Sequence, residues 1–102
     1  MSESIPNSSE NTIDKEKYIK LMASNLKVLR AKAGMTQEDL SKAAGISRQT
    51  IVQAETTQKL SWGTYLALVF LFSTDEGTLE LMRLLDIYPE NLRLTNISAD
   101  GE

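Results

Sequence analysis

The strongest constraint on the fold is the 20-residue stretch TQEDLSKAAGISRQTIVQAE, whose residues mark two short helices and the turn between them. Thr36 is a suitable N-cap, because its hydroxyl can accept a hydrogen bond from an amide of the first helical turn. Gly45 stands where a helix ends in the left-handed conformation, and Ser47 is the next N-cap. Ile46 and Ile51 have the spacing of a hydrophobic staple around that cap. This arrangement predicts a helix-turn-helix.

Further helices are expected on both sides of this motif. Residues 14–33 repeat apolar side chains at spacings of three and four, which predicts one helix with a single buried stripe. The stripe consists of Tyr18, Met22, Leu26, Leu29 and Ala33. Another helix is expected over residues 62–72, and Ser73–Glu76 has the pattern of a capping box for a last helix that Pro89 ends. We therefore expect an all-α domain of about five helices over residues 14–88.

The two ends of the chain differ from this domain in composition. Residues 1–13 are rich in Ser, Asn and Glu, and they carry too little apolar surface to offset the entropy of ordering. We expect a disordered N-terminal tail, with a regulatory arm as the alternative. Residues 89–102 contain Leu92, Leu94 and Ile97, which favour a C-terminal extension packed as a strap or a short strand.

Composition limits the chemistry of the chain. It contains neither cysteine nor histidine, which removes disulfides and histidine-dependent triads and leaves only carboxylates as metal ligands. The carboxylates that lie close together stand at expected helix starts, where capping and the helix dipole explain them; they are Asp14, Glu16, Glu38, Asp39, Asp75 and Glu76. No glycine-rich phosphate loop occurs. The longest apolar run, residues 65–72, is far shorter than the roughly 20 residues that span a bilayer, and no signal-peptide pattern is present. We expect a cytoplasmic protein that binds no cofactor, metal or membrane and that is not an enzyme.

The net charge of −3 hides an uneven distribution. Residues 20–60 carry a net +4, residues 1–19 a net −2 and residues 61–102 a net −5. Surface charges separated by more than about 8–10 Å are screened at physiological salt, so local charge decides the attraction to phosphates. The positive charge lies on the helix-turn-helix, and its modest size predicts weak non-specific binding to nucleic acid.

The segment from about Leu26 to about Phe72 resembles the helix-turn-helix of the phage repressor and Cro family, also called the XRE family. In LRAKAGMTQEDLSKAAGISRQTIVQAE the resemblance is carried by an Arg before a Gly, a Thr-Gln pair, a Leu, an Ala-Ala-Gly-Ile turn, and then Ser, Thr-Ile and a closing Glu. It implies a lambda-repressor-like bundle of five helices whose helix 48–55 enters the major groove of double-stranded DNA. It also implies a partly buried ion pair between Arg30 and Glu55.

The first residues of a helix in the major groove face the base edges. Arg48 can donate two hydrogen bonds to guanine, and Gln49 and Gln53 can each pair with adenine, although simple solvent exposure is the alternative for both glutamines. The resemblance implies that these three residues contact bases. Lys20 and Lys27 could reach the DNA backbone or serve solubility alone. Contacts to the DNA backbone are expected from Gln37, Ser47, Thr50 and Lys59, with a thymine methyl group as the alternative partner of Thr50.

The chain departs from the family pattern after Glu55. Members of the family usually have Asn-Gly-Lys and a proline in this loop, whereas here Thr56 and Thr57 replace the Asn and the Gly, and no proline precedes Trp62. The conformation of the loop and its phosphate contact are therefore open. Lys59 is the candidate for the lost attraction.

The expected helix over residues 62–72 is apolar almost all round, which is more than a helix covered on one side needs. Such surface in a small domain must be covered, either by the C-terminal segment or by another protein. One monomer reads about one half-site, and half-sites about 34 Å apart require a two-fold dimer. We therefore expect a homodimer. The candidate dimer or partner surface consists of Tyr65, Val69, Phe72, Leu81 and Leu84.

These features favour a sequence-specific DNA-binding transcriptional regulator, of repressor type, that binds a two-fold symmetric operator as a dimer. The alternative is an antitoxin, which binds a toxin protein through the apolar helix and the acidic C-terminal third and also binds its own operator. Co-purification with a second small protein would favour that alternative. A third hypothesis is an adaptor that never binds DNA, in which Arg48, Gln49 and Gln53 could be changed without loss of function.

Overall fold

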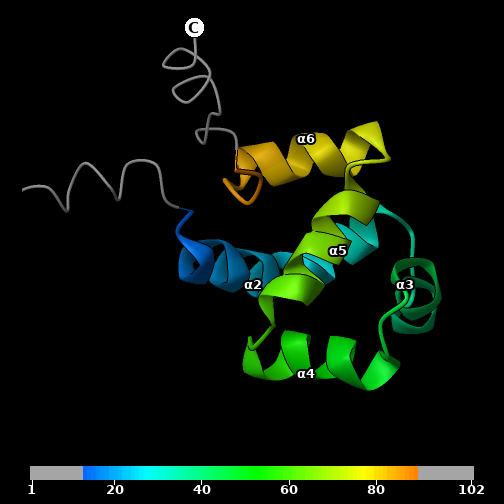
Figure 1. Cartoon of the computed structure of the whole chain (residues 1–102). Coiled ribbons are helices and arrows are strands. Elements are labelled where there is room, and N and C mark those ends of the chain that lie inside the picture. The colour runs from blue at the N-terminus through cyan, green and yellow to red at the C-terminus, as the bar shows by residue number, and fades with distance from the viewer. Residues whose placement is uncertain (1–12, 90–102) are drawn as a thin grey trace, which may run out of the picture.

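The structure is a computed structural model that describes residues 13–89, and this part of the chain is an all-α bundle (Figure 1). Its helices are α2 (Lys15–Lys32), α3 (Gln37–Ala44), α4 (Arg48–Thr57), α5 (Trp62–Phe72) and α6 (Glu76–Leu84). The prediction of an all-α domain with about five helices is confirmed. The expected N-terminal tail and C-terminal strap fall almost entirely outside the described residues.

Helix α2 is the centre of the bundle. It packs against α4, α5 and α6, while α3 packs against α4 and α5. The predicted stripe of α2 is buried, with exposed fractions between 0% and 7%, at Tyr18, Met22, Leu26 and Leu29. Helices α3 and α4 contribute Leu40, Ile51 and Ala54 to the same core. The helix-turn-helix is thus attached to the bundle through a small set of apolar side chains.

Each described helix begins at a side chain that accepts a hydrogen bond from its first turn. The N-caps are Asp14, Thr36, Ser47, Ser61 and Asp75. Thr36 and Asp39 form a reciprocal capping box, in which each backbone amide donates to the other side chain at 3.0 Å. These bonds satisfy amides that have no partner within the helix. The caps at Thr36, Ser47 and Ser61 are those that the sequence predicted.

The start of α6 differs from the prediction. A capping box over Ser73–Glu76 would make Ser73 the N-cap, but the N-cap is Asp75, which accepts a 3.0 Å bond from the amide of Thr78. Ser73 instead follows α5 and donates its hydroxyl to the carbonyl oxygen of Val69 at 2.6 Å. Ser73, Thr74 and Asp75 are three consecutive residues that could each cap the helix. Asp75 is favoured because its carboxylate interacts best with the positive end of the helix dipole.

The chain after α6 folds back onto the core. Helix α6 ends at Leu84, well before Pro89, so the prediction that Pro89 ends this helix is wrong. Ile87 is fully buried, and its carbonyl oxygen accepts a 2.8 Å hydrogen bond from the hydroxyl of Tyr65. Burial, with smaller contributions from two neighbouring tyrosines, raises the pKa of the Tyr65 hydroxyl, which therefore remains a donor.

The expected partner surface needs correction at two residues. Tyr65 and Phe72 are 0% and 2% exposed, because α2, α3 and the segment around Ile87 cover this side of α5. Val69 and Leu81 are half-buried against the core. Leu84 is exposed, and the exposed apolar side chains of α5 are Leu66 and Phe70.

Helix α4 is longer than predicted and ends in a left-handed turn. It continues through Thr57, and Gln58 then has φ 60° and ψ 33°, with its amide bonded to the carbonyl oxygen of Ala54 at 2.9 Å. Glycine usually supplies this conformation at the end of a helix, because a side chain is strained there. The loop thus has a glycine-type turn without a glycine.

We expect Gln58→Gly to stabilise the protein by about 0.5–1 kcal/mol, because glycine adopts a positive φ without steric strain. Part of the gain is lost to the greater freedom of the unfolded chain. Urea denaturation measures the difference. The control is Lys59→Gly, since Lys59 has no positive φ and should lose stability on the same change. Equal losses from both variants would show that Gln58 is not strained.

We expect Tyr65→Phe to destabilise the protein by about 1–3 kcal/mol, because the buried carbonyl oxygen of Ile87 would lose its donor while the ring stays in place. Denaturation in urea is again the measurement. Tyr88→Phe is the matched control, because the Tyr88 hydroxyl makes no hydrogen bond within residues 13–89. If the two variants unfold at the same urea concentration, the bond to Ile87 contributes nothing.

Candidate nucleic-acid interface

The outer side of α4 presents three polar side chains to solvent. Arg48, Gln49 and Gln53 are exposed, and within the described part of the chain none of the three side chains makes a hydrogen bond or an ion pair. Gln49 and Gln53 are four residues apart and therefore lie on one face of the helix, one turn apart. Ile51 and Ala54 are buried on another face. The packing of α4 thus leaves all three side chains available to a ligand.

The first turn of α4 is fixed by its cap. The hydroxyl oxygen of Ser47 accepts the amide of Thr50 at 3.1 Å and lies 2.8 Å from the Thr50 hydroxyl. Both hydroxyls were expected to contact the DNA backbone, and the structure engages them with each other. The bond between the two hydroxyls uses one of their two O–H groups, so one O–H remains to donate to a phosphate oxygen.

The turn between α3 and α4 is held by a contact that the sequence did not suggest. Gly45 has φ 69° and ψ 33°, the predicted left-handed conformation. The hydroxyl of Ser41 donates to the carbonyl oxygen of Ile46 at 2.6 Å, and the amide of Ile46 donates to the carbonyl oxygen of Ser41 at 3.1 Å. This pair of bonds fixes the path of the chain into α4. A serine near the end of a helix gives no sequence signal for such a role.

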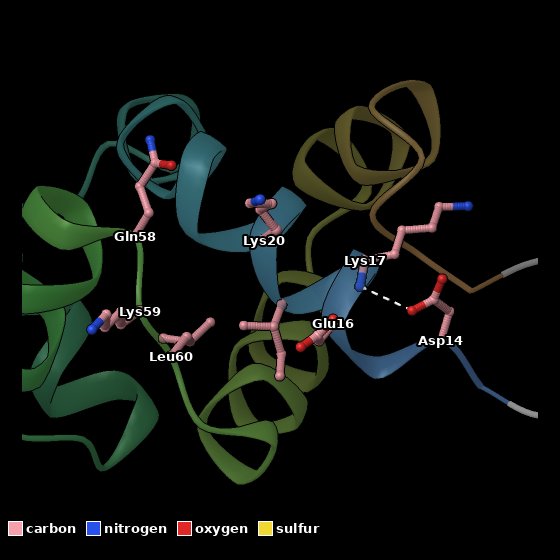
Figure 2. A pocket seen from close by; sticks show the side chains of 8 residues that line it. Asp14, Glu16, Lys17, Lys20, Gln58, Lys59 and Leu60 are labelled. Atoms are coloured by element: carbon pink, nitrogen blue, oxygen red, sulfur yellow. Dashed lines mark hydrogen bonds between the residues drawn. The ribbon is translucent and has the colours of Figure 1, made fainter.

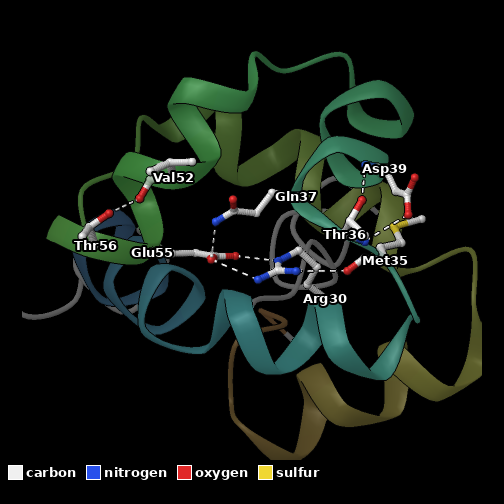
Figure 3. Close-up of polar contacts among 8 residues, drawn as sticks. All are labelled: Arg30, Met35, Thr36, Gln37, Asp39, Val52, Glu55 and Thr56. Atoms are coloured by element: carbon white, nitrogen blue, oxygen red, sulfur yellow. Dashed lines mark hydrogen bonds and ion pairs between the residues drawn. The ribbon is translucent and has the colours of Figure 1, made fainter.

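The expected ion pair between Arg30 and Glu55 is present behind α4 (Figure 3). Nε of Arg30 donates to Oε2 of Glu55 at 2.8 Å, and Nη2 donates to Oε1 at 3.2 Å. The third nitrogen, Nη1, donates to the carbonyl oxygen of Met35 at 3.1 Å. The two side chains are 15% and 9% exposed. One guanidinium therefore ties the end of α2 to α4 and to the segment that leads into α3.

Gln37 joins the same cluster, which its expected contact with DNA did not indicate. Its Nε2 donates to Oε1 of Glu55 at 3.0 Å (Figure 3). Burial alone would raise the pKa of the Glu55 carboxyl, but the hydrogen bonds from Arg30 and Gln37 and the charges of Arg30 and Lys27 outweigh it and lower the pKa. Glu55 is therefore held as a carboxylate. An amide carries two N–H groups, so Gln37 keeps one donor beyond its bond to Glu55.

Four lysines lie near this side of the molecule in different settings. Lys27 lines a hollow with Gln37 of α3 and with residues of α4. Lys20 and Lys59 line a groove of about 600 Å³ between the start of α2 and the loop after α4 (Figure 2). Lys17 also lines the groove, but its ammonium is 3.1 Å from the carboxylate of Asp86. Lys20, Lys27 and Lys59 are thus the cations placed to act beside α4.

Metal ligation and membrane crossing are two further properties on which the described residues bear. Among residues 13–89 there is no group of three side chains that could hold a metal ion. None of the helices described in this range is long and apolar enough to cross a membrane. Besides the carboxylate of Glu55, which is paired with Arg30, the polar groups described around α4 are guanidinium, amide, hydroxyl and ammonium groups.

We expect Glu55→Gln to lose about 3 kcal/mol at neutral pH, because it leaves the partly buried guanidinium of Arg30 without a counter-charge. The folded-state pKa of Glu55 lies below the usual glutamate value, so the ion pair stabilises fully above that value and its contribution disappears as pH falls through the folded-state pKa. The difference between wild type and variant should therefore shrink in acid.

Thermal denaturation of both proteins from neutral to acid pH measures this difference. Glu80→Gln is the control, because Glu80 is exposed and makes no ion pair or hydrogen bond within the described residues. A difference between wild type and Glu55→Gln that does not change with pH would contradict a role for the charge of Glu55.

Comparison with known proteins agrees with this geometry. No curated protein and no solved structure matches the chain. Residues 21–82 match the family described as the helix-turn-helix domain. This range contains α3, the turn and α4, together with α5 and most of α2 and α6. The resemblance of residues 26–72 to phage repressor and Cro proteins is consistent with this match. The chain belongs to the helix-turn-helix domain family, a class of domains that bind DNA.

Proposed function

We propose that this protein is a sequence-specific DNA-binding transcriptional regulator of repressor type, and that α4 enters the major groove. The observation that carries the proposal is that Arg48, Gln49 and Gln53 are exposed and unpaired on the outer side of α4. On its inner side, α4 is held by the ion pair between Glu55 and Arg30. Arg48 supplies two donors, which match O6 and N7 of guanine. Gln49 and Gln53 each supply a donor and an acceptor, which match N6 and N7 of adenine.

Contacts to the DNA backbone would hold α4 in the groove. Gln37 lies in the first turn of α3, where free amides and the helix dipole favour a phosphate, and it keeps one N–H after bonding Glu55. Ser47 and Thr50 lie at the start of α4, and one O–H of this bonded pair remains to donate to a phosphate. Lys59, with Lys20 beside the groove, adds positive charge. Such contacts set the register of the protein on the duplex without reading its sequence.

The operator would have two half-sites, one for each copy of a homodimer. One copy presents a single α4, which reads about one half-site, and two half-sites about 34 Å apart give the affinity that one lacks. Occupation of such an operator is enough to block access to the DNA that it covers. Repression therefore needs no contact beyond those made to DNA.

An antitoxin remains the second candidate. It would use the same DNA-binding side of α4 and would hold a toxin protein elsewhere on the bundle. The exposed side chain of Phe70, 77% accessible, is the observation that favours a protein-binding surface of some kind. Co-purification of a small protein in equimolar amount with the full chain would support this candidate.

We expect wild-type protein to enrich a two-fold symmetric site from fragmented DNA of its own source at physiological ionic strength. Gln49→Ala should bind that site about 5- to 150-fold more weakly, since each bidentate contact contributes about 1–3 kcal/mol of discrimination. Its affinity for unrelated DNA should not change. Gln49 is exposed, so circular dichroism should show an intact fold.

Lys59→Ala is the comparison, because a phosphate contact weakens binding to all sequences alike and lowers the slope of log affinity against log salt by about 0.9. Enrichment of one site by wild type and Gln49→Ala alike would overturn the assignment of base contacts to α4. Absence of any enriched site would overturn the proposed function.

A further inference from the structure

Helix α5 is apolar on two opposite sides and contains no charged residue. Tyr65, Leu68 and Phe72 point inward and are buried. The opposite side has the helical spacing i, i+3, i+4, i+7, and its members are Gly63, Leu66, Ala67 and Phe70. We name these four residues the α5 stripe. Its two large side chains are 48% exposed at Leu66 and 77% exposed at Phe70.

Gly63 is not explained by the fold of one chain. Its φ is not positive, and a Cβ built at this position would meet no atom within 4 Å. Neither a turn nor packing within the described residues therefore requires glycine, although glycine is the poorest helix former after proline. The missing side chain leaves a notch in the α5 stripe. Glycine at such a place suits a close approach from outside the chain.

We propose that a second copy of this chain covers the α5 stripe, with the two α5 helices packed antiparallel about a two-fold axis that passes between Leu66 and Ala67. In this register Phe70 of each copy lies over Gly63 of the other, and Leu66 lies against Ala67. Each large side chain thus meets a small one, as ridge-into-groove packing requires.

The order of large and small residues in the α5 stripe favours a second copy of the chain as the partner that covers it. A two-fold interface must be complementary to its own copy, and the α5 stripe has large and small residues in an order that satisfies this condition. A different protein would need no such order within one stripe. The absence of charge along α5 means that two copies would bring no like charges together at this contact.

The surface area that the contact would bury indicates under which conditions two copies pair. The exposed parts of one phenylalanine and one leucine amount to roughly 200–250 Å² per copy, so two copies bury far less than the about 1,200 Å² typical of stable interfaces. The pair is therefore weak in solution and becomes stable when two copies occupy neighbouring half-sites, where their effective concentration is high. This last step depends on the proposed function.

The geometry is compatible with one operator. Helix α5 has 11 residues and is therefore about 16 Å long. Because α4 directly precedes α5, antiparallel pairing puts the two α4 helices at opposite ends of the pair. The two α4 helices would then be separated by the length of α5 and by their own distance from its ends, which is the scale of half-sites about 34 Å apart. The two-fold axis would relate the two α4 helices as it relates the two half-sites of the operator.

The chain has no cysteine, so Ala67→Cys introduces a single thiol beside the proposed axis. We expect the full-length variant, at high micromolar concentration and without DNA, to form a disulfide-linked dimer on mild oxidation. Leu84→Cys, at an apolar position on α6 that is 73% exposed, should remain largely monomeric. Equal cross-linking of the two variants, or none in either, would overturn the proposal.

Surface variants in the Ala67→Cys protein test the register. Phe70→Glu should abolish cross-linking, whereas Leu84→Glu should not; both positions are exposed, so both variants should fold. Gly63→Leu is the sharpest variant. It enlarges the apolar surface and would strengthen any unspecific association, but it fills the notch opposite Phe70 and should reduce cross-linking. An increase on Gly63→Leu would overturn the register.

Binding to DNA separates this proposal from the proposed function. On an operator with two half-sites, two copies of Phe70→Glu should no longer bind cooperatively. The variant should keep the wild-type affinity for DNA that contains a single half-site. Retained cooperativity would overturn the α5 contact. Cross-linking of Ala67→Cys without binding to any DNA sequence would leave the α5 contact in place and reject the regulator. A different protein bound over Phe70 in the purified material would reject the second copy as occupant.

Discussion

The orientation of α4 depends on the contact between Arg30 and Glu55. Helices α3 and α4 contribute few side chains to the core, and such a small apolar contact restrains their tilt only weakly. A guanidinium that meets both oxygens of a carboxylate adds direction, because its donors lie in one plane. Glu55 is on the same helix as Gln49 and Gln53, so the ion pair also sets the angle at which these side chains face outward. The polar cluster behind α4 thus determines what its outer side can contact.

The features of the motif that could be predicted from sequence have causes within a few residues. Thr36, Ser47 and Ser61 cap helices through amides three positions ahead, and Gly45 ends a helix through its own φ. The buried stripe of α2 follows from helical periodicity in the same way. The pair of Arg30 and Glu55 is different, because no periodicity relates residues 25 positions apart. It could be expected through the family resemblance alone.

The features that could not be predicted involve elements distant in sequence or choices between equal signals. Helix α5 is apolar all round, so no polar face in its sequence determines its rotation, and the inward position of Tyr65 and Phe72 is set by the surrounding helices. The bond from Gln37 to Glu55 likewise needs the positions of two separate helices. At the start of α6, Asp75 competes with two other possible caps, and the difference between them is small.

The uneven charge explains how an acidic chain can bind DNA by one side. In Figure 1, α4 and α6 lie on opposite sides of the bundle, with α2 and α5 between them. The carboxylates of Glu76 and Glu80, which belong to α6, therefore lie on the far side. One layer of helices is about 10 Å thick, which exceeds the Debye length of about 8 Å in physiological salt. These carboxylates would hardly weaken the proposed attraction of phosphates to Lys59. At lower salt their field would reach further and would repel DNA from α6, so electrostatics would favour the proposed approach through α4.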